Sequence, residues 1–145
     1  MPEANVDSLY DYDPAYLDEI LKSVKTIAMV GASADPSKFS YRVLEVLHEA
    51  GYDIIPVNPN PELNEILGNT VYDSLEDIDR PVDMVDVFRP KEEFYGFAEQ
   101  AIAIGAKVLW GQIGIYDDCA AALAEEAGLQ VVMDRCPKIE LFRPR

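Results

Sequence analysis

The sequence has 145 residues and a formal net charge of -15 at pH 7. Hydrophobic residues make up 49% of it, which suffices for the core of one soluble globular domain. Acidic residues outnumber basic ones 27 to 12. Nucleic acid is therefore an unfavourable partner, because phosphate backbones are bound by clustered Lys and Arg. We find neither a signal-peptide pattern nor an apolar run near the roughly 20 residues that cross a bilayer, so we expect no membrane partner and a cytoplasmic protein.

Cysteine and histidine are scarce. Cys119 and Cys136 are too few for a disulfide scaffold or a zinc site, so we expect free thiols and no metal. The single histidine, His48, falls near the end of a predicted helix, where we assign it a structural role. Asp83 and Asp86 have no acid–base partners in the sequence pattern, so we predict no catalytic residue.

The first predicted element is a helix over residues 14–24. Leu17, Ile20, Leu21 and Val24 follow the spacing of a helix with one buried face. Asp13 precedes it as a plausible N-cap. We interpret residues 1–24 as an N-terminal helical extension and residues 25–145 as the domain proper.

The next segment has the pattern of a nucleotide-binding α/β unit. An apolar strand over 25–30 stops at Gly31, which is followed by Ala32 and Ser33. A helix follows, with Ser40 as its expected N-cap and Gly51 at its end, and then a strand over 53–57. Such a loop brings backbone N–H groups and a helix N-terminus close to a phosphate.

The rest of the chain continues the alternation of strands and helices. Strands are predicted over 82–88, 106–110 and 129–133, with helices over 94–102 and 120–127 between them. A brief strand at 71–72, a short helix at 75–78 and a short tail after Pro137 complete the prediction. This order predicts an α/β fold, a single Rossmann-like doubly wound domain with a five-stranded, mainly parallel sheet. Pro56 cannot donate within an interior strand, so we expect it at a strand end.

The ligand is expected at the carboxyl ends of the strands. That rim comprises residues 31–40, 58–60, 88–90, 110–114 and 134–137. A NAD site is disfavoured, because Gly31 stands without further glycines and Asn58-Pro59 occupies the place of a ribose-binding acid. A ligand with a phosphate on its ribose fits better, with Lys38, Arg42 or Arg89 as cations. NADP and coenzyme A both meet that description.

Six separated motifs resemble one family. They are Val30-Gly31-Ala32-Ser33, Ser40-Tyr41-Arg42-Val43, Pro56-Val57-Asn58-Pro59, Val85-Asp86-Val87-Phe88-Arg89, Trp110-Gly111-Gln112-Ile113-Gly114 and Met133-Asp134-Arg135-Cys136-Pro137-Lys138-Ile139-Glu140. Over residues 20–142 the chain resembles the small stand-alone CoA-binding proteins, whose domain is similar to the CoA-binding domain of succinyl-CoA synthetase alpha subunits. Gly111 departs from the pattern, because a larger apolar residue is expected there.

The resemblance implies a domain that binds coenzyme A or acyl-CoA without a well-defined reaction of its own. The pyrophosphate would contact the loop and the following helix, and the remaining positions would line the two ends of the ligand. The implied pyrophosphate residues are Gly31, Ala32, Ser33, Lys38 and Ser40. The implied residues of the adenosine and pantetheine ends are Asn58, Pro59, Phe88, Arg89, Gln112 and Gly114.

Three functions stay open at this point. A CoA-binding module ranks first, with an unknown protein partner. An enzyme ranks second, either a NADP-binding oxidoreductase fragment or the CoA-binding partner subunit of an acyl-CoA synthetase. A redox-responsive protein ranks third. This hypothesis rests on Cys136, which follows the fifth strand next to Arg135; the arginine would lower the pKa of the thiol and favour a mixed disulfide with coenzyme A.

Overall fold

A parallel β-sheet forms the centre of the computed structural model, which describes residues 10–143. Its strands are β1 (Thr26–Val30), β2 (Asp53–Val57), β5 (Met84–Val87), β6 (Val108–Gly111) and β7 (Gln130–Val132). They lie in the order β2-β1-β5-β6-β7, and every neighbouring pair is parallel. The predicted α/β class and the five-stranded sheet are therefore confirmed.

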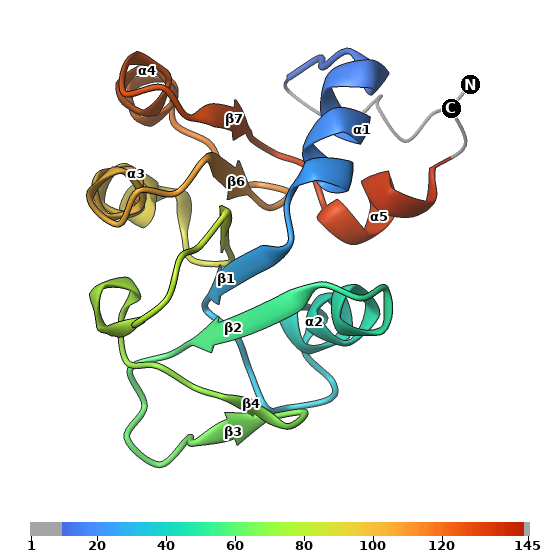
Figure 1. The fold of residues 1–145 in the computed structure, drawn as a ribbon, viewed down its shortest axis with the longest axis vertical. Helices are drawn as coiled ribbons and strands as arrows, with labels where there is room; N and C mark the ends of the chain where they lie inside the picture. The colour runs from blue at the N-terminus through green and yellow to red at the C-terminus, as the bar shows by residue number, and fades with distance from the viewer. Residues whose placement is uncertain (1–9, 144–145) are drawn as a thin grey trace.

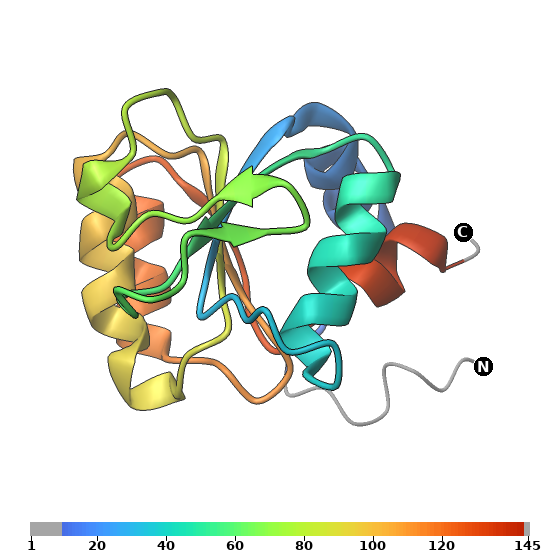
Figure 2. The ribbon, with the colours of Figure 1, turned by 90° about the horizontal axis from the view of Figure 1, so that it is seen from below.

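Helices cover both faces of the sheet (Figures 1 and 2). On one face lie α3 (Phe94–Ala103) and α4 (Asp118–Glu126), and on the other lie α1 (Pro14–Ser23), α2 (Phe39–Glu49) and α5 (Pro137–Phe142). Each face has its own apolar core, because side chains alternate along the strands. Helix α5 stands where only a short tail was predicted, since six residues are too few to show helical periodicity.

The chain reverses its direction across the sheet between β1 and β5. From β1 it passes through α2 to β2, then returns across β1 to form β5. The loops that follow Val30 and Val87 consequently diverge onto opposite faces. In open α/β sheets such a switch point is where ligands bind.

Pro56 lies in an edge strand, not in the interior strand that we expected. It is the fourth of five residues in β2, which ends the sheet, and it pairs with Met29. The amide of Asp53 donates to the Lys25 carbonyl of the adjoining segment. Because strand amides alternate in direction, the nitrogen of Pro56 faces away from β1, and no ladder bond to β1 is lost.

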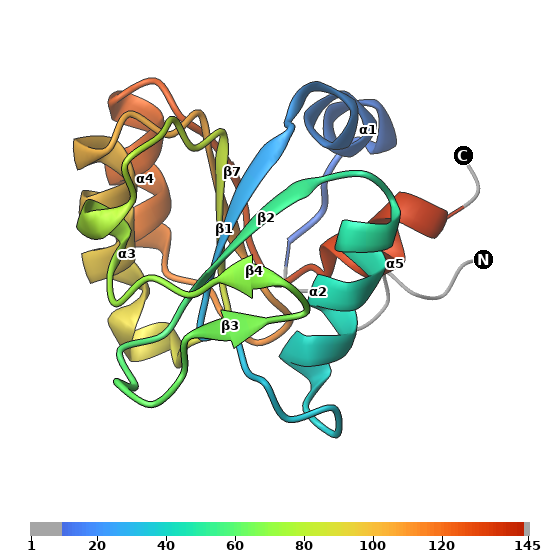
Figure 3. The ribbon, with the colours of Figure 1, turned by 60° about the horizontal axis from the view of Figure 1, so that its bottom comes forward.

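Between β2 and β5 the chain forms small elements (Figure 3). Strands β3 (Glu65–Ile66) and β4 (Asn69–Thr70) form an antiparallel pair, and the 3-10 turn η2 (Leu75–Asp77) follows them. A second 3-10 turn, η3 (Lys91–Glu93), lies outside this region, between β5 and α3. The strand predicted at 71–72 is a single bridge, in which the Tyr72 amide donates to the Pro56 carbonyl at 3.0 Å and its carbonyl accepts from the Asn58 amide at 2.9 Å. This bridge brings Asp73 and Ser74 beside the end of β2.

The N-terminal segment covers the other edge of the sheet. Asp13 accepts a hydrogen bond from the Ala15 amide at 2.9 Å, as its predicted capping role requires. The Tyr16 hydroxyl accepts from the amide of Val131 and donates to its carbonyl, both at 3.0 Å, and the Tyr12 hydroxyl accepts from the Met133 amide at 2.8 Å. Residues 1–9 of the predicted extension lie outside the described residues. Within residues 10–143, no helix has the length and apolar character needed to span a membrane.

Candidate nucleotide-binding site

Gly31 sits where two loops touch at the switch point. Its φ is +87°, and a Cβ there would lie 2.9 Å from the Phe88 carbonyl oxygen and 3.2 Å from Cδ of Arg89. Its amide donates to the Val57 carbonyl at 3.1 Å. Glycine is thus required by the backbone geometry and by the close approach of the β5 loop, whatever ligand is bound.

Local hydrogen bonds shape the loop that leads from Gly31 to α2. The Ser33 hydroxyl accepts from the Asp35 amide at 3.0 Å, and Asp35 accepts from the amide and hydroxyl of Ser37 at 2.9 and 2.8 Å. These bonds from Ser37 lower the pKa of the Asp35 carboxyl. Helix α2 has the exposed Lys38 at its N-cap and no side-chain cap. The predicted cap, Ser40, is instead the buried second residue of the helix.

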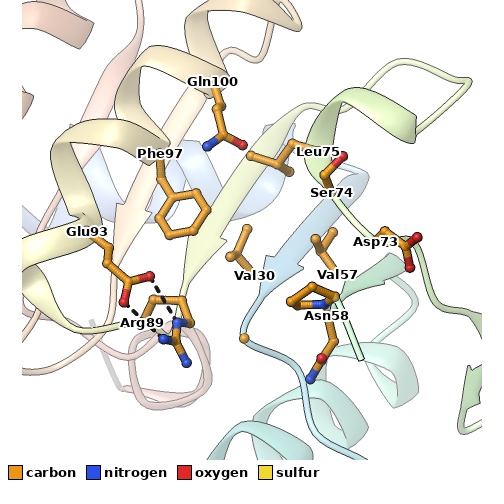
Figure 4. A pocket seen from close by; sticks show the side chains of 12 residues that line it. Val30, Val57, Asn58, Asp73, Ser74, Leu75, Arg89, Glu93, Phe97 and Gln100 are labelled. Carbon is orange, nitrogen blue, oxygen red and sulfur yellow. Dashed lines mark hydrogen bonds and ion pairs between the residues drawn. The ribbon is translucent and has the colours of Figure 1, made fainter. Parts of the chain in front are cut away.

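A cavity of about 370 Å³ opens beside Gly31, on the α3 face of the sheet (Figure 4). Its walls are apolar, its rim carries amide and hydroxyl groups, and three charged residues lie around it. The lining comprises Val30, Gly31, Val57, Leu75 and Phe97; Asn58, Pro59, Ser74 and Gln100; and Asp73, Arg89 and Glu93. Four of the predicted site residues, Gly31, Asn58, Pro59 and Arg89, are therefore brought together here.

Arg89 is held at the rim of this cavity by Glu93. Its Nε and Nη2 donate to the two carboxylate oxygens at 3.1 and 2.9 Å, and Figure 4 shows the pair. The hydrogen bond from Arg89 lowers the pKa of Glu93. Arg89 thus faces the cavity, where the sequence predicted a ligand-binding cation, and is also paired with a surface carboxylate.

Asn58 ties the end of β2 to the glycine loop. Its Nδ2 donates to the Ala32 carbonyl at 2.8 Å, and its Oδ1 accepts from the Asn60 amide at 2.9 Å. Buried Ala32 lies directly after Gly31. Asn58 therefore fixes the relative position of the loops that follow β1 and β2.

Asp73 is a lining residue that the sequence reasoning missed. The end of β2 itself carries no acid, but the bridge between Val57 and Tyr72 supplies one from a segment that follows the β3–β4 pair. A single bridge has no periodic signal in the sequence. The folded chain therefore has a carboxylate beside the end of β2, where the sequence pattern indicated none.

A second cavity, of about 390 Å³, is lined by Phe88 and by residues of α2 and the β6 loop. The lining is Phe39, Phe88, Gln112, Ile113 and Ile115. Phe88 and Arg89 are neighbours in sequence, so the two cavities flank the contact between Gly31 and the β5 loop. Gly114 is exposed beside this cavity, and its amide donates to Asp134 Oδ1 at 2.7 Å.

The glycine at position 111 is explained by crowding. A Cβ there would lie 2.5 Å from the Ile115 carbonyl oxygen and 3.2 Å from the ring of Phe94. The β6 loop folds back directly over the strand, so the larger apolar residue of the family pattern would not fit at this position unless the loop moved.

A carboxyl group is buried within the central strand β5. Asp86 is fully buried in β5, and burial raises the pKa of its carboxyl well above the ordinary value. Among residues 10–143, the side-chain polar atoms of Asp86 and Gln112 have no hydrogen-bond partner. Burial, with a smaller contribution from Asp86, also raises the pKa of the Cys136 thiol, although Gln112 and nearby backbone amides oppose the shift.

The environment of Cys136 argues against a reactive thiolate. The side chain is 1% exposed, and the guanidinium of Arg135 is directed to Glu140 at 3.3 Å and to the Tyr10 carbonyl at 2.8 Å. A buried, protonated thiol is a poor nucleophile.

The other cysteine, Cys119, is exposed. Within the described residues, no group of three His, Cys, Asp or Glu side chains is placed to hold a metal ion.

Comparison with known proteins identifies the family. Residues 25–141 match the model of a CoA binding domain. The chain belongs to this family. It is 42% identical over 125 residues to the uncharacterized protein YneT of Bacillus subtilis (strain 168), a match that spans 86% of this chain and 91% of YneT.

Two further relatives are a solved structure of similar length and a subunit of a larger ligase. The solved structure of a hypothetical protein from Pyrococcus horikoshii OT3 has a TM-score of 0.85 and 38% identity, covering 97% of this chain and 96% of that one. The alpha subunit of an ADP-forming acetate–CoA ligase I from Pyrococcus furiosus is 36% identical over 95 residues, which are 63% of this chain and 21% of that subunit. The predicted membership of the small CoA-binding proteins is therefore confirmed, with homology to the CoA-binding region of a ligase subunit.

Proposed function

We propose that this protein binds coenzyme A across the carboxyl edge of its sheet, at the switch point between β1 and β5. The match of residues 25–141 to a CoA binding domain carries the proposal. The shape of the edge supports it, because two cavities of unlike character flank Gly31. Coenzyme A likewise has two unlike ends, a nucleoside and a pantetheine arm, joined by a pyrophosphate.

The nucleoside end belongs in the cavity on the α3 face. Val57, Leu75 and Phe97 offer apolar walls for a purine ring, and Asn58 with Pro59 shapes the side at the end of β2. Arg89 supplies a cation near the ribose phosphate. To reach that phosphate, the guanidinium would turn partly away from Glu93. The Arg89–Glu93 ion pair is exposed, so breaking it costs about 1 kcal/mol or less.

The pyrophosphate would lie over the loop from Gly31 to Ser33 and the start of α2. Helix N-termini favour anions, and the first turn of α2 has no side-chain cap to compete. Lys38 is exposed at that cap, and Ser40 follows in the first turn. Phe88, Gln112 and Gly114 would accompany the pantetheine arm on the α2 face.

We propose a binding module without catalysis, formed by residues 25–145 with residues 1–24 as an extension. Among the described residues, Asp86 and Cys136 are buried with raised pKa values, and His48 lies exposed at the opposite end of α2 from the site. The ligase relationship favours one alternative, a CoA-binding partner of a separate catalytic chain. Asp73 favours another, a dinucleotide ligand, because Rossmann folds hold ribose hydroxyls with an acid near this position.

Backbone NMR during a titration with coenzyme A tests both binding and its location. We expect the amides of residues 31–40, 58–59, 88–89 and 112–114 to shift, while those of α4 and the N-terminal edges of the strands stay unchanged. No shift at millimolar coenzyme A would contradict the function, and shifts confined to another surface would contradict the site.

Lys38→Ala gives a matched chemical test. Loss of one phosphate-facing cation should weaken coenzyme A binding by about fivefold, or about 1 kcal/mol, and reduce its dependence on salt. Lys22→Ala is the control, because Lys22 is an exposed lysine of α1 that pairs with Asp18 at 2.9 Å. Equal effects of the two substitutions would show that only net charge matters.

A further inference from the structure

The second cavity differs chemically from what a pantetheine arm requires. Phe39, Phe88, Ile113 and Ile115 supply its walls, and Gln112 is its one polar residue. A pantetheine arm carries two amides and a hydroxyl, each of which loses water when it enters apolar surroundings. Hydrocarbon has no such cost. The arm would therefore pass along the side of the cavity formed by Phe88 and Gln112, and the rest of the lining suits an apolar group attached to the end of the arm.

The apolar side chains here are open to solvent. Ile113 is 58% exposed and Phe39 is 47% exposed, and both are among the large apolar side chains that the described surface leaves uncovered. The rings of Phe39 and Phe88 lie 6.4 Å apart, inclined at 59°. Two such side chains facing one cavity next to a proposed ligand path indicate that the ligand covers them.

Gln112 supplies the second observation. It is only 3% exposed, and neither its Oε1 nor its Nε2 has a nitrogen or oxygen partner within residues 10–143; its interaction with the Cys136 thiol is a weak one. A buried amide without partners is costly and calls for a group that is absent from the free protein. Gln112 lines this cavity, but its amide atoms are shielded from solvent in the free protein, so a ligand carbonyl becomes an acceptor for the amide N–H when the side chain turns toward the cavity.

We infer that the cavity formed by Phe39, Phe88, Gln112, Ile113 and Ile115 holds the acyl group of an acyl-CoA thioester, with Gln112 donating to the thioester carbonyl. This inference rests on the proposed binding of coenzyme A and adds the class of ligand, thioesters with an apolar acyl chain. Free coenzyme A would bring its arm beside Phe88 and Gln112, but it has no acyl chain to cover Phe39 and Ile113 and no thioester carbonyl to accept from the Gln112 amide.

Calorimetric titration with coenzyme A and its acetyl, butyryl and hexanoyl thioesters tests the inference. Each methylene buried should tighten binding by up to about fourfold, which corresponds to about 0.8 kcal/mol. Ile113→Ser should weaken hexanoyl-CoA by several fold while changing coenzyme A by less than about twofold. Phe142→Ser is the matched control, because Phe142 is 67% exposed in α5 and should affect neither ligand.

The carbonyl contact has a separate test. Hexanoyl-CoA should bind about fivefold more tightly than its thioether analogue S-hexyl-CoA, which lacks the carbonyl, and Gln112→Leu should abolish that difference. Equal affinities of coenzyme A and all its thioesters would overturn the acyl site and leave the proposed function standing. Absence of binding for every compound in the series would overturn the proposed function itself.

Discussion

At the scale of single residues, Gly31 fixes the geometry of the proposed site through two separate constraints. Its φ is +87°, and the Phe88 carbonyl oxygen occupies the space of a side chain. We expect Gly31→Ala to lower the free energy of unfolding by about 2–3 kcal/mol, measured by urea denaturation.

Two other glycines separate these constraints. Gly128 has a φ of +95°, and a Cβ added there would meet nothing within 4 Å, so Gly128→Ala should cost only about 1 kcal/mol. Gly96 is a residue of helix α3, and a Cβ added there would meet nothing within 4 Å. Gly96→Ala should therefore raise the free energy of unfolding by about 0.5–1 kcal/mol. If Gly31→Ala costs no more than Gly128→Ala, the contact with Phe88 is unimportant.

The pKa of Asp86 is raised in the folded protein and that of Asp83 is lowered, so we expect the two carboxyl groups to make stability depend on pH in opposite directions. Burial raises the pKa of Asp86, so the folded state holds its proton more tightly than the unfolded state, and stability falls as pH rises above the unfolded pKa. Asp86→Asn should therefore stabilise the protein at pH 7 but not near pH 3.

Asp83 has the reverse balance. Burial alone would raise its pKa, but hydrogen bonds from the Lys25 and Thr26 amides, at 2.9 and 3.1 Å, with the charges of Lys107 and Lys25, lower it overall. Its stabilisation is present above the unfolded pKa and is lost as pH falls through the folded pKa. Asp83→Asn should destabilise at pH 7 and have less effect in acid. Parallel pH profiles of urea denaturation for the two variants would refute this account.

Asp73 should oppose a ligand with a ribose phosphate. A carboxylate in the cavity lining repels that phosphate, by about 1 kcal/mol for charges near 4 Å in water. We expect Asp73→Asn to tighten coenzyme A binding by about two- to fivefold at low salt and to leave dephospho-CoA almost unchanged. Glu76→Gln, in the adjacent turn η2 but outside the lining, is the control. A loss of dephospho-CoA binding in Asp73→Asn would instead indicate a contact with ribose hydroxyls.

At the scale of elements, the N-terminal segment protects an exposed strand edge. The hydroxyl of Tyr16 satisfies both outward backbone groups of Val131 in β7. Unpaired edge groups are templates for pairing with other chains. Tyr16→Phe should lower the free energy of unfolding by about 1–2 kcal/mol and increase self-association in sedimentation experiments. Tyr95→Phe, on the exposed surface of α3, should do neither.

The helices and strands of the sheet were largely predictable because their signals are local and periodic. Leu17, Ile20 and Leu21 mark the buried face of α1, and Asp13 caps it as predicted. Short elements carry no such signal, and the six-residue α5 was missed for this reason. The expected cap at Ser40 is wrong, because burial inside α2 and not a capping hydrogen bond decides its position.

At the scale of the whole molecule, strand order determines which residues meet, and local patterns do not encode it. The placement of β2 at the edge accounts for Pro56, which an interior strand would exclude. The same topology unites Gly31, Asn58 and Arg89 around one cavity, as the rule for parallel sheets led us to expect. A single bridge brings Asp73 to the cavity, and the burial of Gln112 depends on segments that are far apart in the sequence.

The central claim is that this edge of the sheet binds coenzyme A. Its most direct test is calorimetric titration of the purified, ligand-free protein with coenzyme A, with NAD and NADP as controls. We expect coenzyme A to bind with micromolar or lower Kd, about -8 kcal/mol or better, and the dinucleotides to bind far more weakly. Tight binding of NAD or NADP with no response to coenzyme A would contradict the account and favour a dinucleotide-dependent function.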